Sequence, residues 1–528
     1  MMPIACGDQS RDRAEKLARL DDAYDLLIIG GGATGLGTAV DAASRGYKTA
    51  LVEAGDFAQA TSSRATKLVH GGVRYLASGQ IHLVYEALRE RKLMMQNAPH
   101  LVHPLAFITP AYSWFDIPYF GTGLKLYDLL SGSSSIGPTK IVSAEETRQR
   151  IPGIQEKGLK GGVMYYDGQF DDARFALALA RTAEDRGALV LNYVRCTALL
   201  KTFGRVDGAV VTDVETGNTF HLRTKAVINA GGIFSDSVRR MDNGSAPNLL
   251  AVSRGTHIVV SSAVLGRDTA IVVPKTRDGR VVFAIPWLGS VVIGTTDLPA
   301  PSAEIEPGHD AAEIDYLMET VNPYLARPIT KADIVSVFSG LRPLIRGIAA
   351  TTAKLSREHS MEISESGMVT IAGGKWTTYR RMAEDVIDFA IGKGSLPERQ
   401  CVSATIKLHG ASQLHGTSKA DCRFGQYGSD AAKIASIMDG DPRMSTKLDE
   451  ALPFVAAEVV YGVREEMART VEDMLARRTR ALFLNAKAAQ RAAPLVANVM
   501  AKELGRDSAW AQRQTESFEK MAKEFYEV

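Results

Sequence analysis

The stretch that most constrains the fold covers residues 24–53, YDLLIIGGGATGLGTAVDAASRGYKTALVE. An apolar run is followed by three glycines, a segment of small residues and a second apolar run that ends on an acid. Gly30, Gly32 and Gly35 occupy the glycine positions of G-x-G-x-x-G, and Glu53 follows 18 residues after Gly35. This order predicts a strand, a tight turn, a helix and a second strand, whose terminal acid accepts a hydrogen bond from a ribose hydroxyl.

The three glycines have separate tasks in such a dinucleotide-binding unit. Gly30 permits the tight turn, Gly32 lets a pyrophosphate approach the backbone, and Gly35 lets the helix lie close to the strand. The helix also begins with free N–H groups and the positive end of its dipole, which attract phosphate. A glycine turn that only packs a helix on a sheet stays as the alternative interpretation.

Composition narrows the class of protein. The 528 residues are enough for two to four domains, and 45% apolar with 23% charged residues is typical of a globular protein. A net charge of +2 gives no argument for nucleic acid. The four cysteines are scattered without a C-x-x-C pair, which fits a reducing compartment. No cluster of Cys and His has metal-ligand spacing, so no metal is predicted.

The sequence contains no apolar run of 18 residues, so no membrane-spanning helix is expected. The first 21 residues are polar, lack an apolar signal segment and are interpreted as a flexible lead-in. Local signals also predict element ends: a helix starts after Ser143, a turn lies at Asp167-Gly168, and Asp171 or Asp172 begins a long helix.

Residues 105–130 concentrate aromatic side chains in what is interpreted as one short loop around Pro118. One interpretation is an aromatic wall of a substrate domain. The other is an interfacial element that dips into the headgroup region of a bilayer, with Lys125 beside it. The sequence alone leaves both open.

Several motifs occur in a fixed order along the chain: GGGATG, SSRATKLVHGGVRYL from Ser62, INAGG, FSGLRPL, SREH and GGKWTTYR. Together they resemble the FAD-dependent glycerol-3-phosphate dehydrogenases, the respiratory, quinone-linked enzymes of bacterial type. The resemblance covers roughly residues 22–395 and is most specific at KLVHGGVRYL and GGKWTTYR. No acidic D-x-[DN]-x-[DN]-G loop follows in the C-terminal region, so the calcium-binding extension of mitochondrial relatives is not expected.

The resemblance implies an α/β fold: a Rossmann-like FAD-binding domain, an antiparallel β-rich substrate domain and a C-terminal all-α cap. The expected divisions are a lead-in (1–21), the FAD-binding domain (22–104, 161–250 and 334–399), a substrate- or membrane-facing segment (105–160), the substrate sheet (251–333) and the helical domain (400–528). The cap is interpreted as packing rather than chemistry.

The implied reaction oxidises sn-glycerol 3-phosphate to dihydroxyacetone phosphate with non-covalent FAD, and passes electrons to ubiquinone. The implied partners are therefore glycerol 3-phosphate, ubiquinone and a membrane surface, bound as a peripheral or monotopic protein on the cytoplasmic face of the inner membrane. A homodimer is allowed and nucleic acid is not expected. Alternatives are a glycerol-3-phosphate oxidase that uses oxygen, a related FAD-dependent amine oxidase, and a flavin-binding sensor without turnover.

Site residues follow from matching motif positions. Besides Gly30, Gly32, Gly35 and Glu53, the expected FAD contacts are Ser62, Ser63, Thr66, Lys67, Ala230, Gly231, Gly374, Lys375 and Thr377. A phosphate dianion needs several fixed cations, and the expected substrate contacts are His70, Arg74, Tyr75, Arg342, Arg357 and Lys375.

Loss of a hydride from an alcohol also needs a base for the hydroxyl proton, and histidine suits this task near neutral pH. His257, in SRGTH, is the expected base, and His70 is interpreted as a substrate or flavin contact. Arg342 and Lys375 complete the expected catalytic set. The alternative for His257 is a structural role, as a hydrogen-bonded residue within a sheet.

Overall fold

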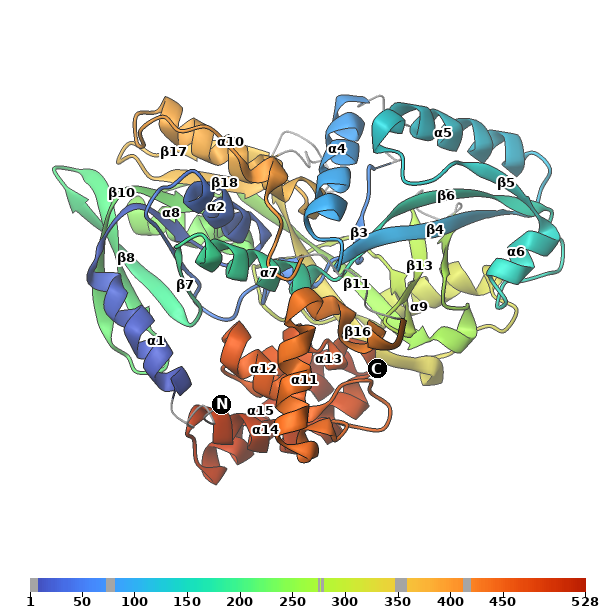
Figure 1. Ribbon diagram of the computed structural model, residues 1–528. Coiled ribbons are helices and arrows are strands. Elements are labelled where there is room, and N and C mark those ends of the chain that lie inside the picture. The colour runs from blue at the N-terminus through green and yellow to red at the C-terminus, as the bar shows by residue number, and fades with distance from the viewer. Residues whose placement is uncertain (1–7, 73–80, 274–275, 277–279, 347–358, 412–418) are drawn as a thin grey trace.

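The computed structural model describes residues 8–72, 81–273, 276, 280–346, 359–411 and 419–528, and it divides into two sheet-based layers and a helical domain beneath both (Figure 1). Among these residues no helix is both long enough and apolar enough to cross a bilayer. The expected fold class, a Rossmann-like domain with a β-rich domain and a helical C-terminal region, is confirmed.

The first sheet contains the dinucleotide-binding unit. In strand order it runs β17 (His359–Ile363), β18 (Val369–Gly373), β10 (Thr219–Asn229), β1 (Ala23–Ile29), β2 (Thr49–Val52) and β7 (Leu189–Leu191). The strands from β18 to β7 are parallel, whereas β17 and the hairpin of β8 (Val194–Thr202) with β9 (Arg205–Asp213) are antiparallel additions. Helix α2 (Ala33–Ser44) packs between α7 (Asp172–Asp185) and α10 (Tyr379–Gly392), and α8 (Ser235–Asp242) contacts β8 and β10.

The second sheet combines strands from distant parts of the chain. Its order is β15 (Leu298–Pro299), β11 (Leu250–Ser261), β14 (Ser290–Gly294), β13 (Val282–Trp287), β12 (Thr269–Val273), β4 (Val102–Ala111), β6 (Gly161–Phe170) and β3 (Leu68–Val69), with β16 (Ile334–Ile345) on β11 and β5 (Lys140–Ser143) on β6. Most pairs are antiparallel as expected, but β4 and β12 are parallel, which makes the sheet mixed. The expected boundaries at 161 and 334 assign β6 and β16 to the FAD-binding domain, whereas both strands pair within this second sheet.

The helical domain contains α11 (Ala431–Gly440), α12 (Ala456–Glu466), α13 (Ala481–Leu484), α14 (Ala486–Leu504) and α15 (Ser508–Tyr526). Its apolar core continues into the second sheet, because Val259, Trp287 and Phe338 pack in the same buried cluster. The domain therefore completes the interior behind β11 and β16.

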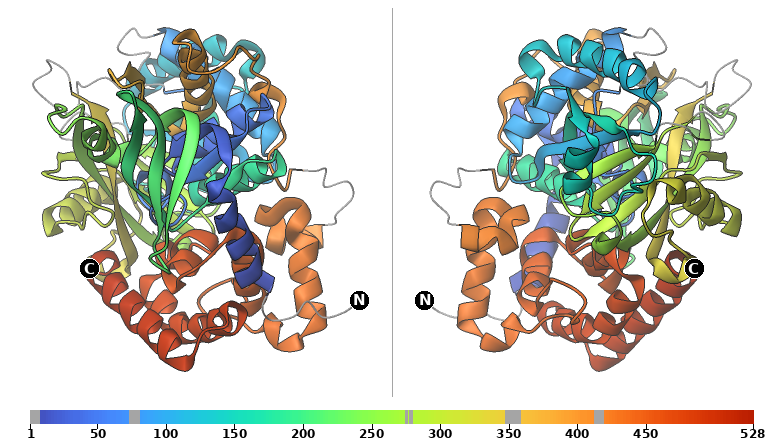
Figure 2. Two further views of the ribbon diagram at one scale, coloured as in Figure 1. Left: turned by 90° about the vertical axis from the view of Figure 1, so that its left-hand side faces the viewer. Right: turned by 90° about the vertical axis from the view of Figure 1, so that its right-hand side faces the viewer.

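Three local expectations are corrected. Residues 8–18 form helix α1 rather than a flexible lead-in, and Arg13 on it donates to Asp213 at 2.7 Å. Figure 2 shows α1 between the first sheet and the helical domain.

The other two corrections concern residues 105–168. A turn is expected at Asp167-Gly168, but these residues belong to β6 and pair with β4. The aromatic loop is largely helix α5 (Asp116–Ser131), since Pro118 lies in its first turn, where no N–H donor is lost from the ladder.

Other signals are confirmed. Ser143 caps α6 (Ala144–Arg150) by accepting from the Glu146 N–H, and Asp171 caps α7 by accepting from the Arg174 N–H. Helix α4 (Ile81–Asn97) contacts α5, and α9 (Ala311–Val321) contacts β11.

Candidate functional site

Four predicted cofactor-binding segments meet at one edge of the first sheet. They follow the carboxyl ends of β18, β10, β1 and β2, and these strands are adjacent and parallel. The segments are Gly374–Thr377, Ala230-Gly231, the turn at residues 30–32, and Glu53. In open α/β sheets, ligands bind in the crevice outside these strand ends.

The glycine turn leaves no room for side chains. Gly30 has φ +116°, and a Cβ there would lie 2.5 Å from the Ala230 carbonyl oxygen. A Cβ on Gly35 would lie 1.9 Å from the Gly30 carbonyl oxygen, so glycine is required where α2 crosses β1. These contacts fix the turn at the start of α2, which is the position where the pyrophosphate of a dinucleotide is expected.

Glu53 is held by backbone donors at the tip of β2. Its Oε2 accepts from the Gly31 N–H at 2.6 Å, and its Oε1 accepts from the Gly55 N–H at 2.9 Å. Burial raises the pKa of Glu53, while the N–H groups of Gly55 and Gly31 oppose that rise. The carboxyl group is thus oriented beside the turn, where a ribose hydroxyl is expected.

The segment Ser62–Lys67 has a mixed role. The Ser62 hydroxyl accepts from the Ala33 N–H at 2.9 Å, directly at the start of α2 where phosphate is expected. Ser63 is buried. The Lys67 ammonium is also buried and donates to both Asp172 carboxylate oxygens and to the Ser63 carbonyl. The Lys67 side chain therefore stabilises the protein interior. Only the backbone of Lys67 could contact a cofactor.

His257 lies on β11 in an almost closed environment. Its Nε2 is 3.0 Å from Thr66 Oγ1, and its ring stacks on Phe338 with centroids 4.6 Å apart. Burial, then the positive charges of Arg342 and Lys67, lowers the pKa of His257 well below its ordinary value. The imidazole is consequently neutral at pH 7 and retains the lone pair that a general base needs.

Arg342 lies one strand away on β16. Its guanidinium donates to Thr295 Oγ1 and the Thr296 carbonyl, both at 3.2 Å, and lies 3.5 Å from Asp297 Oδ1. Pairing of β11 with β16 places it opposite Ser253, on the strand that carries His257. The Arg342 side chain remains partly exposed, as a phosphate ligand requires.

The late turn lies against the early polar segment. Trp376 Nε1 donates to the Ser62 carbonyl at 2.9 Å, and Thr377 Oγ1 lies 3.5 Å from the His70 carbonyl. Lys375 precedes these residues at the end of β18 and is partly exposed. Segments more than 300 residues apart in sequence are thereby brought together, as the two most specific motifs require.

Arg74, Tyr75 and Arg357 lie outside the described residues, so their predicted substrate contacts stay predictions. Near them in sequence, His359 is 3.1 Å from Asp385. Sequence reasoning missed the buried charges around the site: Asp56, Asp172, Arg477, Arg478 and Arg480, none of them more than 1% exposed. The burial of these arginines could have been suspected from the ARRTR run at residues 476–480, because apolar residues stand on both sides of it.

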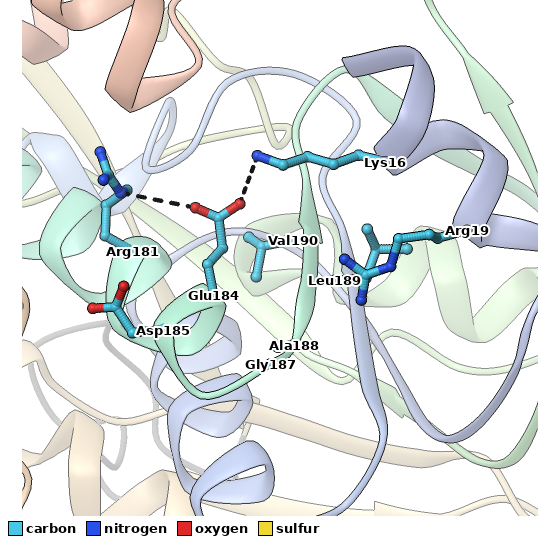
Figure 3. A pocket seen from close by; sticks show the side chains of 9 residues that line it. All are labelled: Lys16, Arg19, Arg181, Glu184, Asp185, Gly187, Ala188, Leu189 and Val190. Carbon is cyan, nitrogen blue, oxygen red and sulfur yellow. Dashed lines mark hydrogen bonds and ion pairs between the residues drawn. The ribbon is translucent and has the colours of Figure 1, made fainter. Parts of the chain in front are cut away.

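A separate cavity of about 340 Å³ lies between α1, α7 and β7 (Figure 3). Lys16 and Arg181 both approach Glu184 there, at 2.9 and 3.9 Å. Gly187–Val190 line it at the start of β7, which is the opposite end of the parallel strands from Glu53. This cavity is therefore not the dinucleotide site.

Comparison with known proteins agrees with this geometry. Residues 25–380 match the family model described as FAD dependent oxidoreductase. Residues 370–511 match the model described as the C-terminal domain of alpha-glycerophosphate oxidase.

Individual relatives extend the similarity over nearly the whole chain. The mitochondrial glycerol-3-phosphate dehydrogenase of Macaca fascicularis is 40% identical, over 96% of this chain and 74% of that protein. The mitochondrial enzyme of Arabidopsis thaliana is 39% identical, over 97% and 87%. The FAD complex of glycerol-3-phosphate dehydrogenase from Bacillus halodurans superposes with a TM-score of 0.79, at 29% identity and 98% coverage of both chains.

Proposed function

Because this chain belongs to the FAD-dependent glycerol-3-phosphate dehydrogenases, we propose that it oxidises sn-glycerol 3-phosphate to dihydroxyacetone phosphate and delivers the electrons to ubiquinone. The observation that carries the proposal is the convergence of the glycine turn, Glu53 and the Gly374–Thr377 turn at one sheet edge. A neutral histidine and a partly exposed arginine stand on neighbouring strands of the second sheet.

The residues present fit FAD. The steric limits at Gly30 and Gly35, the Ser62 hydroxyl at the start of α2 and the oriented Glu53 carboxyl match a dinucleotide's pyrophosphate and ribose. Bound FAD supplies the hydride acceptor, a chemistry that no side chain provides.

The chain's own residues bind the substrate and move its proton. Oxidation at C2 breaks one C–H and one O–H bond, and the carbonyl forms as hydride and proton leave. We assign the hydroxyl proton to neutral His257, and the phosphate to Arg342 with Lys375. Arginine supplies a rigid pair of donors to phosphate, and lysine supplies a point charge.

Anaerobic addition of sn-glycerol 3-phosphate should bleach the oxidised flavin of the purified holoprotein, because electrons then have no other acceptor. Glycine serves as the control for an amine oxidase and should leave the absorbance unchanged. Persistent yellow colour with glycerol 3-phosphate would point to a sensor and refute the proposed reaction.

The electron acceptor needs its own measurement, because a flavin can reduce quinone or oxygen. We expect turnover with a soluble ubiquinone analogue and little peroxide under air. Stoichiometric peroxide formation, unchanged by the quinone, would identify an oxidase instead.

We also place the membrane contact at α5 and its preceding turn. Trp114, Phe115 and Tyr119 are 68%, 85% and 77% exposed, and Leu126 and Leu129 on the same helix are also exposed. Lys160 lies 5.6 Å from the Trp114 ring. Exposed aromatic side chains beside a cation are typical of an interfacial element. We propose that α5 binds the membrane peripherally, and that the membrane face is the cytoplasmic face of the inner membrane, as the family resemblance implies.

Replacing Phe115 and Tyr119 by serine should weaken binding to phosphatidylethanolamine–phosphatidylglycerol vesicles at least about tenfold, since two large apolar contacts are lost. Phe203→Ser is the matched control, because Phe203 is fully exposed in the β8–β9 turn and β8 lies far from α5 (Figure 1). Cosedimentation measures binding. Equal loss in both variants, or no loss in the double variant, would exclude α5 as the anchor.

A further inference from the structure

We propose that Asp56, Arg477 and Arg478 form a clamp through which the helical domain sets the affinity of the protein for FAD. These three residues, called the Asp56 clamp below, are positioning residues, because they act through the loop that follows Glu53. The proposal concerns the cofactor and is independent of the substrate.

The loop 53–58 is built onto the glycine turn. The Ala58 N–H donates to the Gly31 carbonyl at 3.0 Å, while the Gly31 N–H donates to Glu53. A Cβ on Gly31 would lie 2.8 Å from both the Glu53 Cβ and the Phe57 ring, so loop and turn are in direct contact. Any displacement of the loop therefore moves both the ribose-facing carboxyl and the turn that faces the pyrophosphate.

Asp56 anchors this loop from inside. Its carboxylate accepts from Arg477 Nε at 2.5 Å, from Arg478 Nη2 at 2.9 Å and from Asn192 Nδ2 at 3.1 Å, with a further bond from Arg478 Nη1. Asp56 and Arg478 are completely buried, and Arg477 is almost so. Burial alone would raise the pKa of Asp56, but Arg478 and Arg477 lower it to about 2, so the carboxylate is charged at pH 7.

The arginines are fixed by the helical domain. Arg477 also donates to Glu472 and Asp473, each at 2.7 Å, and Arg478 donates to the Glu466 carbonyl at 2.6 Å. Residues 473–478 form a π-helical turn, a rare geometry that is frequent at functional sites. The loop beside the dinucleotide site thus takes its position from the helical domain.

A second buried ion pair offers a control for simple domain docking. Arg174 on α7 and Glu466 on α12 join the same two parts of the molecule, with a distance of 2.6 Å and little exposure. This pair shares the burial and charge type of the Asp56 clamp. Arg478 donates to the Glu466 backbone carbonyl, which Glu466→Gln leaves in place, whereas the Glu466 carboxylate accepts from Arg174 on α7. Removing one partner of either buried pair leaves an uncompensated charge, so both variants should lower stability.

The test compares FAD affinity in Asp56→Asn and Glu466→Gln holoproteins, with thermal stability measured in parallel. Release of FAD on dilution is followed by the rise of free-flavin fluorescence. Asp56→Asn should raise the dissociation constant about tenfold or more, because the loop loses a charged anchor, whereas Glu466→Gln should change it less than about threefold. The conservative Arg478→Lys, which keeps the charge and loses the forked contact, should fall between them.

Equal FAD release from Asp56→Asn and Glu466→Gln would show that only domain docking matters and would overturn the proposal. Wild-type FAD affinity in Asp56→Asn would overturn it too. If Asp56→Asn does not fold, the comparison of Arg478→Lys with Glu466→Gln decides by the same criterion. The test measures FAD release and thermal stability and not substrate turnover. Its result therefore does not depend on whether the proposed reaction is correct.

Discussion

His257→Asn is expected to slow anaerobic reduction of the bound flavin by about 10²- to 10⁴-fold, the usual contribution of a positioned general base. His257 is the neutral imidazole between Thr66 and Phe338, on the strand next to Arg342. Asparagine keeps a polar side chain but takes up no proton at pH 7. Stopped-flow absorbance measures the rate, and the ratio of flavin to protein absorbance measures cofactor content.

FAD content should stay at the wild-type level in this variant, because His257 belongs to the second sheet and the strand-end cradle belongs to the first. His70→Asn is the matched comparison, since His70 is the other motif histidine and its carbonyl lies 3.5 Å from Thr377 Oγ1 in the late turn. A near-normal rate in His257→Asn, together with a collapsed rate in His70→Asn, would transfer the role of base to His70.

The lowered pKa of His257 also predicts the direction of the pH effect. Its pKa in the folded protein lies well below the ordinary value of 6.5, mainly through burial. Below pH 6.5 the unfolded chain takes up a proton at His257 and the folded protein does not. The free energy of unfolding therefore decreases as the pH is lowered through this range. His257→Asn should lack that part of the acid dependence in thermal unfolding.

Local signals were sufficient for the dinucleotide unit. The glycines at 30, 32 and 35 and the acid at 53 specify turn, helix and strand within one short segment, and no distant partner is needed to interpret them. The capping residues Ser143 and Asp171 are local in the same way. The sheet edge could then be predicted, because parallel strands present their carboxyl ends together.

The features that could not be predicted from the sequence depend on partners far away in the chain. Lys67 stands in a polar run that predicts phosphate contacts, yet its ammonium pairs with Asp172, more than 100 residues later. Residues 8–18 are polar and are interpreted from the sequence as a flexible lead-in, whereas they form α1, from which Arg13 bonds to the distant Asp213. Charged side chains are normally exposed, so neither the burial of Lys67 nor that of Arg477 follows from residue type.

The α5 segment shows a different limit. The aromatic residues around Pro118 are interpreted from the sequence as a loop, but a proline in the first helical turn costs no ladder hydrogen bond. The interfacial interpretation stays a proposal, and the exposed side chains of Phe115 and Tyr119 on which it rests belong to one surface helix and its start.

Arg342→Gln is expected to lower kcat/KM for sn-glycerol 3-phosphate by about 10- to 100-fold, the equivalent of one or two charged hydrogen bonds to phosphate. The guanidinium is positioned by Thr295 and Thr296, and the side chain remains partly exposed, so loss of the guanidinium should weaken binding without unfolding β16. FAD content should be unchanged.

Inorganic phosphate distinguishes a phosphate contact from a contact to the substrate's hydroxyl groups. If Arg342 binds phosphate, the inhibition constant of inorganic phosphate should rise in parallel with KM in Arg342→Gln. Arg254→Gln is the matched control: Arg254 pairs with Leu341 across the same two strands, but its guanidinium binds Asp310 and Glu313. A raised KM with an unchanged inhibition constant for phosphate would show that Arg342 contacts the substrate's hydroxyl groups instead. An equal loss of kcat/KM in Arg342→Gln and Arg254→Gln would show that Arg342 only supports the sheet.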